Sequence, residues 1–114
     1  MFLIHGYLYT MKGAPVADGF IEMQDGHIVS VGPMSELTDV PAGAVDLKGA
    51  TVTPGFIDAH THLGIFEDGL NFEGDDCNEM TDILTPQLRA IDGINPMDPT
   101  FREAALAGIT TVCT

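Results

Sequence analysis

Residues 51–64 have the sequence Thr-Val-Thr-Pro-Gly-Phe-Ile-Asp-Ala-His-Thr-His-Leu-Gly. A Pro-Gly turn precedes a short apolar run, and this run ends at two histidines separated by one residue. Residues i and i+2 of an extended strand point to the same face, so we expect His60 and His62 to present their imidazoles side by side at the carboxyl end of a strand over 56–60. Alternate strand residues are about 6.5–7 Å apart, which lets both rings turn toward one metal ion.

The charge balance excludes two classes of partner. The sequence contains 4 Lys and Arg against 17 Asp and Glu, for a net charge of −13. We therefore expect no binding to nucleic acid and none to a membrane surface. Acidic residues without any Lys or Arg gather between positions 67 and 82: Glu67, Asp68, Glu73, Asp75, Asp76, Glu79 and Asp82. Such a run is typical of a solvated loop, and the alternative is a loop at the rim of a site that holds a cation.

The two cysteines and the start of the chain bear on the compartment. Cys77 and Cys113 form neither a CxxC pair nor a zinc-finger spacing. The first residues lack a basic region followed by a long apolar one, and no run approaches the roughly 18–20 apolar residues of a membrane span. We expect a cytoplasmic location and two free thiols.

The first half of the sequence has a β pattern. Strands are expected over 2–9, 19–24 and 27–32, and Asp25-Gly26 predicts a type I′ hairpin turn between the last two. One short helical turn is expected at 33–37. Two further short strands, 45–47 and 51–53, flank a turn at Lys48-Gly49. Residues 1–53 are therefore predicted to form a small antiparallel, β-sandwich-like flanking domain of five short strands.

Residues 54–114 have a different, α/β pattern. The strand over 56–60 is followed by an acidic loop over 63–85, a possible short helix over 86–91 and a helix over about 99–107, with Asp98 as its N-cap, Pro99 at its first position and Gly108 as its stop. A β-branched strand over 109–114 ends the sequence. A strand–helix–strand unit implies parallel strands. Because two parallel strands alone leave both sheet edges open, we expect the isolated chain to self-associate.

The histidine pair supplies only part of a metal site. Catalytic zinc usually takes three protein ligands and leaves one position for water. His5 and His27 have no partner at metal spacing, so they are interpreted as exposed or structurally hydrogen-bonded histidines. The missing ligands would have to come from other strands.

The segment 54–62, Pro-Gly-Phe-Ile-Asp-Ala-His-Thr-His, resembles the opening motif of the amidohydrolase superfamily, Pro-Gly-apolar-apolar-Asp-x-His-x-His on the first barrel strand. The hairpin 25–32, the stretch 46–49 and the turn 53–55 are similar to the family's β-sandwich flank. The later stretches 90–98 and 103–112, the second of which contains Gly-Ile-Thr-Thr-Val, resemble the imidazolonepropionase-related branch.

The resemblance implies a role for particular residues. His60 and His62 match the two ligands of the more buried metal, and Asp58 matches a supporting position, which we interpret as a carboxylate that caps backbone amides or orients a ligand. Gly55 and Gly64 match turn positions. Asp75, Asp76 and Glu79 match no ligand of the family.

The resemblance also implies an architecture and a reaction. The fold would be the first strand–helix–strand unit of a (β/α)8 TIM barrel, incomplete in this chain, after half of a β-sandwich flank. The reaction would be hydrolysis of amide or other C–N bonds of a small molecule by metal-activated water, with one or two divalent ions, zinc in the first place. The family's further ligands would lie beyond Thr114, and Lys12 and Lys48 sit in turns where neither can bridge metals.

Three hypotheses follow. The first is the amino-terminal part of an amidohydrolase-type enzyme, inactive on its own. The second is a stand-alone β-rich binding or interaction module without catalysis. The third is a metal-independent protein that kept the start of the fold. Open parallel edges favour the first, because a small natural domain should cover them.

Overall fold

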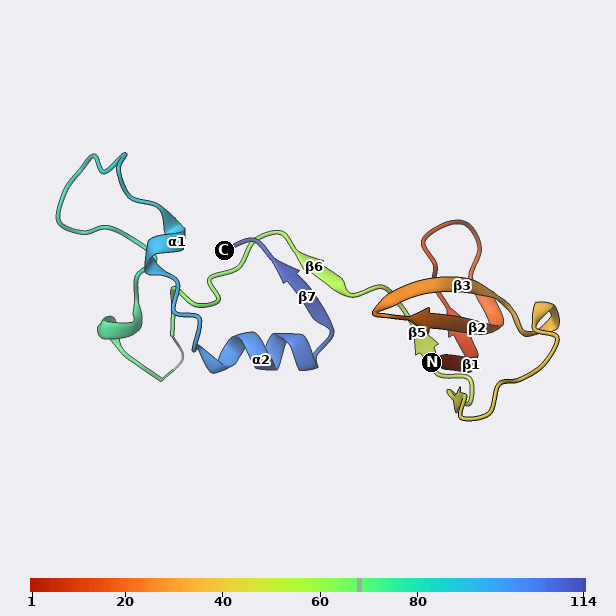
Figure 1. Cartoon of the computed structure of the whole chain (residues 1–114). Helices are drawn as coiled ribbons and strands as arrows, with labels where there is room; N and C mark the ends of the chain where they lie inside the picture. The colour runs from red at the N-terminus through yellow and green to blue at the C-terminus, as the bar shows by residue number, and fades with distance from the viewer. Residues whose placement is uncertain (68) are drawn as a thin grey trace. The chain divides into compact units, whose positions relative to one another are not determined.

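The computed structural model describes residues 1–67 and 69–114, so Asp68 of the predicted acidic loop lies outside the described residues. The chain forms two compact units, unit 1 (Met1–Pro54) and unit 2 (Gly55–Thr114) (Figure 1). Unit 1 contains β1 (Phe2–Leu8), β2 (Val16–Gln24), β3 (His27–Pro33), the 3-10 turn η1 (Met34–Glu36), β4 (Val45–Asp46) and β5 (Thr51–Val52). Unit 2 contains β6 (Phe56–Asp58), the 3-10 turn η2 (Phe72–Gly74), α1 (Ala90–Gly93), α2 (Pro99–Leu106) and β7 (Ile109–Val112).

The hairpin of unit 1 forms as predicted. β2 and β3 are antiparallel, with Gln24 opposite His27. The backbone φ angles of Asp25 and Gly26 are 51° and 78°. A type I′ turn requires positive φ at both central residues, which explains why this pair stands between the two strands.

The pairing of the two short strands differs from the prediction. β4 and β5 do not form an antiparallel pair with one another; both pair with β1, and both run parallel to it. Lys48 and Gly49, with φ of 53° and 81°, form a turn along this segment. Gly49 N donates to His5 O at 2.7 Å and Tyr7 N donates to Ala50 O at 3.0 Å, so the turn stays attached to β1. The sheet of unit 1 is therefore mixed rather than antiparallel.

The backbone of β1 is irregular at His5, whose φ is 56°. The register between β1 and β2 shifts on each side of Gly6, so both strands carry bulges there. His5 Nδ1 and Asp18 Oδ1 lie 2.9 Å apart and form a hydrogen bond across this irregularity. His5 thus has the structural hydrogen bond expected of it, and His27 is exposed at the start of β3.

One sheet, in the order β3-β2-β1-β4 with β5 also on β1, makes up unit 1. The predicted sandwich would need a second packed sheet, and the described residues of unit 1 form a single sheet. Its core consists of Ile4, Leu8, Phe20 and Ile21, and Leu8 is only 2% exposed. Full burial of a side chain of this size contributes about 1.5–3 kcal/mol.

Unit 2 is a strand–helix–strand unit. β6 and β7 are parallel, as predicted, and α2 contacts β7. The N-cap of α2 is Asp98, with Pro99 in the first turn, and the helix ends before Gly108, whose φ of 92° suits a helix stop. Each of these three assignments was predicted from the sequence.

Three boundaries in unit 2 differ from the prediction. β6 ends at Asp58 rather than at His60, because the Asp58 carboxylate accepts a hydrogen bond from the His60 N–H and turns the chain. β7 ends at Val112, two residues before the final one. The short helix expected over 86–91 is α1, which begins only at Ala90. The loop predicted over 63–85 contains η2 and an isolated bridge between Phe66 and Asp75.

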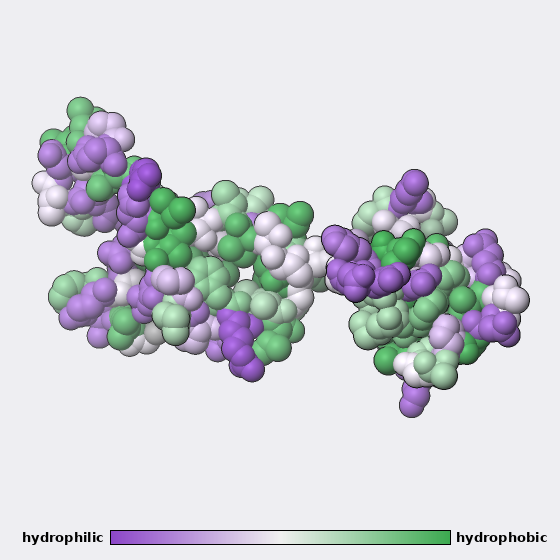
Figure 2. All heavy atoms as spheres, in the orientation of Figure 1, coloured by the Kyte–Doolittle hydropathy of each residue, from purple (hydrophilic) through white to green (hydrophobic). Residues whose placement is uncertain are grey.

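Large apolar side chains are exposed on both units, as the green areas of Figure 2 show. In unit 2, Phe56 is 60% exposed and Ile57 is 74% exposed, so the outer surface of β6 is uncovered within this unit. Within residues 1–67 and 69–114, no helix has the length and apolar character needed to cross a membrane.

Candidate metal centre

His60 and His62 follow directly after the carboxyl end of β6, and both side chains are exposed. Their ring centroids lie 5.3 Å apart, with the ring planes at 77°. The prediction that the two imidazoles lie side by side is therefore confirmed, although the residues belong to the turn after the strand and not to the strand itself.

Backbone hydrogen bonds to the end of the chain hold this turn. Cys113 N donates to Asp58 O at 2.9 Å, and Thr61 N donates to Cys113 O at 3.1 Å. Thr114 Oγ1 donates to Leu63 O at 3.2 Å. The pairing of β6 with β7 thus continues for several residues beyond both strands, and it fixes Thr61, the residue between the two histidines.

Asp58 is half-buried at the end of β6. Its Oδ1 accepts a hydrogen bond from the His60 N–H at 3.2 Å. This is the backbone-capping contact that we expected of a supporting carboxylate. Its role toward a metal stays a prediction.

The separation of the two rings fits a shared metal ion. Imidazoles bound to one tetrahedral zinc ion, with Zn–N bonds of about 2 Å, have centroids about 5 Å apart. The observed 5.3 Å agrees with this separation. Within the described ranges, no group of three or more His, Cys, Asp or Glu side chains could hold a metal.

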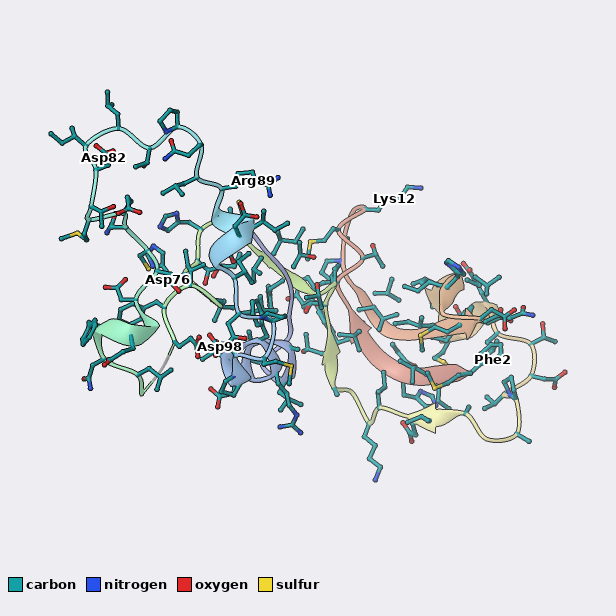
Figure 3. All side chains as sticks on the ribbon, turned by 60° about the vertical axis from the view of Figure 1, so that its left-hand side comes forward. Phe2, Lys12, Asp76, Asp82, Arg89 and Asp98 are labelled. Atoms are coloured by element: carbon teal, nitrogen blue, oxygen red, sulfur yellow. The ribbon has the colours of Figure 1, made fainter. Side chains whose placement is uncertain are left out.

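A second set of contacts fixes the chain just after the histidines. Gly64 N donates to Asp98 Oδ2 at 3.1 Å, and Thr100 N donates to Asp98 Oδ1 at 2.9 Å. Asp98 is only 3% exposed, and Figure 3 shows it at the start of α2. One buried carboxylate therefore joins the turn at Gly64 to the first turn of α2.

The surroundings of Asp98 favour its ionised form. The Thr100 side chain and backbone N–H, followed by the Gly64 N–H, lower the pKa of Asp98, and desolvation opposes them. Of these two Thr100 groups, the backbone N–H donates a hydrogen bond to Asp98 Oδ1. The buried Thr100 hydroxyl lies nearby but has no hydrogen-bond partner among the described residues. We therefore expect a charged carboxylate at neutral pH.

Glycine is required at the two positions that flank the histidine pair, for different structural reasons. Gly64 has a φ of 82°, and a Cβ atom there would lie 2.7 Å from Phe101 Cζ, so the position requires both the turn and the close approach. Gly55 was predicted as a turn glycine. Its constraint is instead the side chain of Thr110, which occupies the space that a Cβ atom would need.

Three acidic side chains of the 63–85 loop, those of Asp75, Glu79 and Asp82, accept local hydrogen bonds, whereas Glu67 Oε1 accepts one from Asn95 Nδ2 at 2.9 Å. Asp75 Oδ1 accepts from Cys77 N at 3.2 Å, and Asp76 N donates to Ile65 O at 2.8 Å. Glu79 accepts hydrogen bonds from the Thr81 hydroxyl and backbone N–H, which lower its pKa. These contacts match the solvated-loop interpretation, and the described residues offer no metal cluster at the loop.

Asp98 is the helix cap that the sequence predicts, but its bond to Gly64 was not predicted. The contact of Asn95, whose N–H donates to Gly64 O at 2.8 Å, was not predicted either. The local signal, Asn95-Pro96-Met97-Asp98-Pro99, predicts a turn and a cap. No spacing rule connects that turn with a glycine 34 residues earlier in the chain.

Comparison with known proteins relates the chain to one family. The sequence model of the amidohydrolase family matches residues 43–91, which include the histidine pair. The chain is 36% identical to an amidohydrolase of known structure from Thermotoga maritima, with a TM-score of 0.81 over 97% of this chain and 28% of that one.

Curated relatives point the same way. Amidohydrolase tasK of Hapsidospora irregularis is 35% identical over 96 residues, which is 82% of this chain and 10% of that protein. Imidazolonepropionase of Symbiobacterium thermophilum is 39% identical over 74 residues, which is 51% of this chain and 17% of that protein. The chain thus spans less than a fifth of the length of either relative.

Proposed function

The chain belongs to the amidohydrolase family, and from this premise we propose that His60 and His62 ligate a divalent metal in a hydrolase that acts on amide or other C–N bonds of a small molecule. One observation carries the proposal. The two imidazoles lie 5.3 Å apart at the carboxyl end of β6. Active sites of barrel enzymes are built at this end of the strands.

Zinc is the ion we propose first, since imidazole nitrogen is one of its preferred ligands. When bound, such an ion polarises a carbonyl group and lowers the pKa of water. The residues of this chain would hold the ion and orient its ligands. His60 and His62 supply two nitrogen ligands, and Asp58 fixes the backbone at His60 through its 3.2 Å hydrogen bond.

The charge of the chain supports a cation at this site. Most of its acidic residues follow Pro54, where the only Lys or Arg residues are Arg89 and Arg102. A negative field raises the local concentration of cations and weakens as salt is added.

We also propose that residues 1–114 alone carry out no turnover. A catalytic zinc site takes about three protein ligands and one open position. Unit 2 contributes two adjacent histidines. Incubation of the chain with zinc and a cyclic amide such as a hydantoin should therefore give no hydrolysis above the rate with zinc alone.

Zinc titration of the chain by calorimetry tests the ligand assignment. His60→Ala and His62→Ala should each weaken zinc binding about tenfold or more. His27→Ala, which removes an exposed histidine in unit 1, is the control and should leave binding within twofold. Equal losses in all three variants would contradict the assignment. Absence of zinc binding by the unsubstituted chain would favour the alternative, a β-rich interaction module without a metal.

A further inference from the structure

The turn that begins at His62 is held by hydrogen bonds within itself and to the segment 95–98. His62 O accepts hydrogen bonds from Ile65 N at 3.1 Å and from Phe66 N at 3.0 Å, which closes a turn over 62–66. Gly64, in the middle of this turn, donates its N–H to Asp98 Oδ2 and accepts at its carbonyl from Asn95 N. Both backbone groups of Gly64 are thus bound by the segment 95–98.

The segment 95–98 is itself held by hydrogen bonds. Asp98 N donates to Asn95 O at 3.2 Å, and Asp98 Oδ1 caps α2 through Thr100 N. Asp98 is 3% exposed, so its carboxylate meets these two donors with little competition from water. The Asp98 side chain therefore fixes the position of the 62–66 turn relative to α2 together with the hydrogen bond from Asn95 N to Gly64 O.

The backbones at the two histidines are held by different contacts, and Leu63, next to His62, is in addition bound by Thr114 Oγ1 beyond β7. His60 is bound through Asp58 Oδ1, and Thr61 through Cys113 O, so both belong to the β6–β7 end. His62 begins the turn that Gly64 fastens to Asp98. Because different contacts hold the backbone at each histidine, we expect that loosening one set changes the distance between the rings.

We propose that Asp98 is the positioning residue of the histidine pair: its hydrogen bond to Gly64 fixes the turn after His62 and thereby the separation of the two imidazoles. The consequence for metal affinity rests on the proposed function of the pair. The consequence for the turn does not depend on that function.

Two substitutions separate this role from helix capping. Gly64 and Thr100 donate to different oxygens of the Asp98 carboxylate. Asn has a single acceptor oxygen on its amide, and Ser has a single short hydroxyl, yet both are good N-caps. Asp98→Asn and Asp98→Ser should therefore keep the cap and lose the bond to Gly64. Ala105→Gly is the matched control, because it weakens α2 through an exposed helical position and leaves both bonds in place.

The first measurement uses the metal-free chain and amide hydrogen exchange by NMR. In Asp98→Asn and Asp98→Ser we expect the Gly64 amide to exchange about tenfold faster or more, the Thr100 amide to stay within about twofold, and the ring-to-ring cross-peaks between His60 and His62 to weaken. Ala105→Gly should leave the Gly64 amide and these cross-peaks unchanged. Unaltered cross-peaks in both Asp98 variants, together with fast exchange at Gly64, would overturn the proposal.

The second measurement is the zinc dissociation constant, with the histidine ring resonances as the spectroscopic signature. Supporting contacts of metal ligands typically change affinity 10–100-fold, so we expect a rise of about tenfold in both Asp98 variants and a shift of the His62 ring signals. Ala105→Gly should stay within twofold. If Ala105→Gly weakens zinc as much as Asp98→Asn for the same loss of Tm, the effect is one of stability and the proposal is wrong. If the unsubstituted chain binds no zinc, the proposed function fails, and the exchange and cross-peak results alone decide the role of Asp98.

Discussion

Gly55 and Thr110 lie so close that a Cβ atom at position 55 would stand 2.8 Å from the Cβ of Thr110. Gly55 directly precedes β6, and Thr110 lies in β7, where Ile109 is opposite Phe56. Glycine at position 55 thus lets the chain enter β6 while a β-branched residue occupies β7. The His-x-His turn follows only five residues later, so the approach of these two backbones also sets where the candidate metal centre begins.

Gly55→Ala should destabilise unit 2, because the added methyl group must displace Thr110. Overpacking of this kind costs about 1–3 kcal/mol. The free energy of unfolding can be followed through the amide resonances of β6 and β7 in a urea titration. Gly93→Ala serves as the control, since a Cβ there meets nothing closer than 3.7 Å. A Gly55→Ala variant as stable as Gly93→Ala would contradict the prediction, because it would show that the Thr110 side chain moves aside at little cost.

The ionisation of Asp98 predicts how the stability of unit 2 depends on pH. The pKa of Asp98 is lowered in the folded state by Thr100 and Gly64. A lowered pKa contributes stability that is fully present above the unfolded value of about 3.9 and is lost as the pH falls through the folded value. The gap in unfolding free energy between the unsubstituted chain and Asp98→Asn should therefore be larger at pH 6 than at pH 3. A gap that is the same at both pH values would contradict the prediction.

The two cysteines should differ in reactivity. Both are free, Cys113 is exposed and Cys77 is half-buried. Desolvation, followed by its contacts with Asp75 and the nearby Asp76, raises the pKa of the Cys77 thiol. The thiolate is the nucleophile, so a thiol-specific disulfide reagent at pH 7.5 should label Cys113 first. Mass spectrometry of Cys77→Ser and Cys113→Ser chains identifies the site. Faster labelling in the chain that keeps only Cys77 would refute this order.

Local rules predicted the elements of this fold whose cause lies within a few residues. Asp25-Gly26 specified the hairpin because two successive residues need positive φ, which they have at 51° and 78°. Asp98 and Pro99 specified the start of α2, and the order strand–helix–strand specified that β6 and β7 are parallel. The histidine spacing likewise predicted the closeness of the two rings.

Contacts between residues far apart in the sequence were not predicted by these local rules. β4 and β5 have two residues each, too few to show an alternating pattern, and their direction follows from hydrogen bonds to β1 such as Leu47 N to Ile4 O at 2.8 Å. The bond from Gly64 to Asp98 joins two turns that are each explained locally. The candidate site is therefore predictable at His60 and His62, and its support at Asp98 is visible only in three dimensions.

We propose, finally, that the isolated chain self-associates through β6. Within the described part of unit 2, β6 pairs with β7 alone, and Ile57 on β6 is 74% exposed. An open strand edge with apolar side chains favours pairing with another copy, while the net charge of −13 opposes it. Salt screens the repulsion, so the mass measured by light scattering should rise with protein concentration and with ionic strength. Ile57→Lys should reduce the association. Ile83→Lys makes the same change in charge at a loop residue that is 97% exposed, and it should reduce association less. A sharp monomer at micromolar concentration in high salt, or equal effects of the two variants, would rule out association through β6.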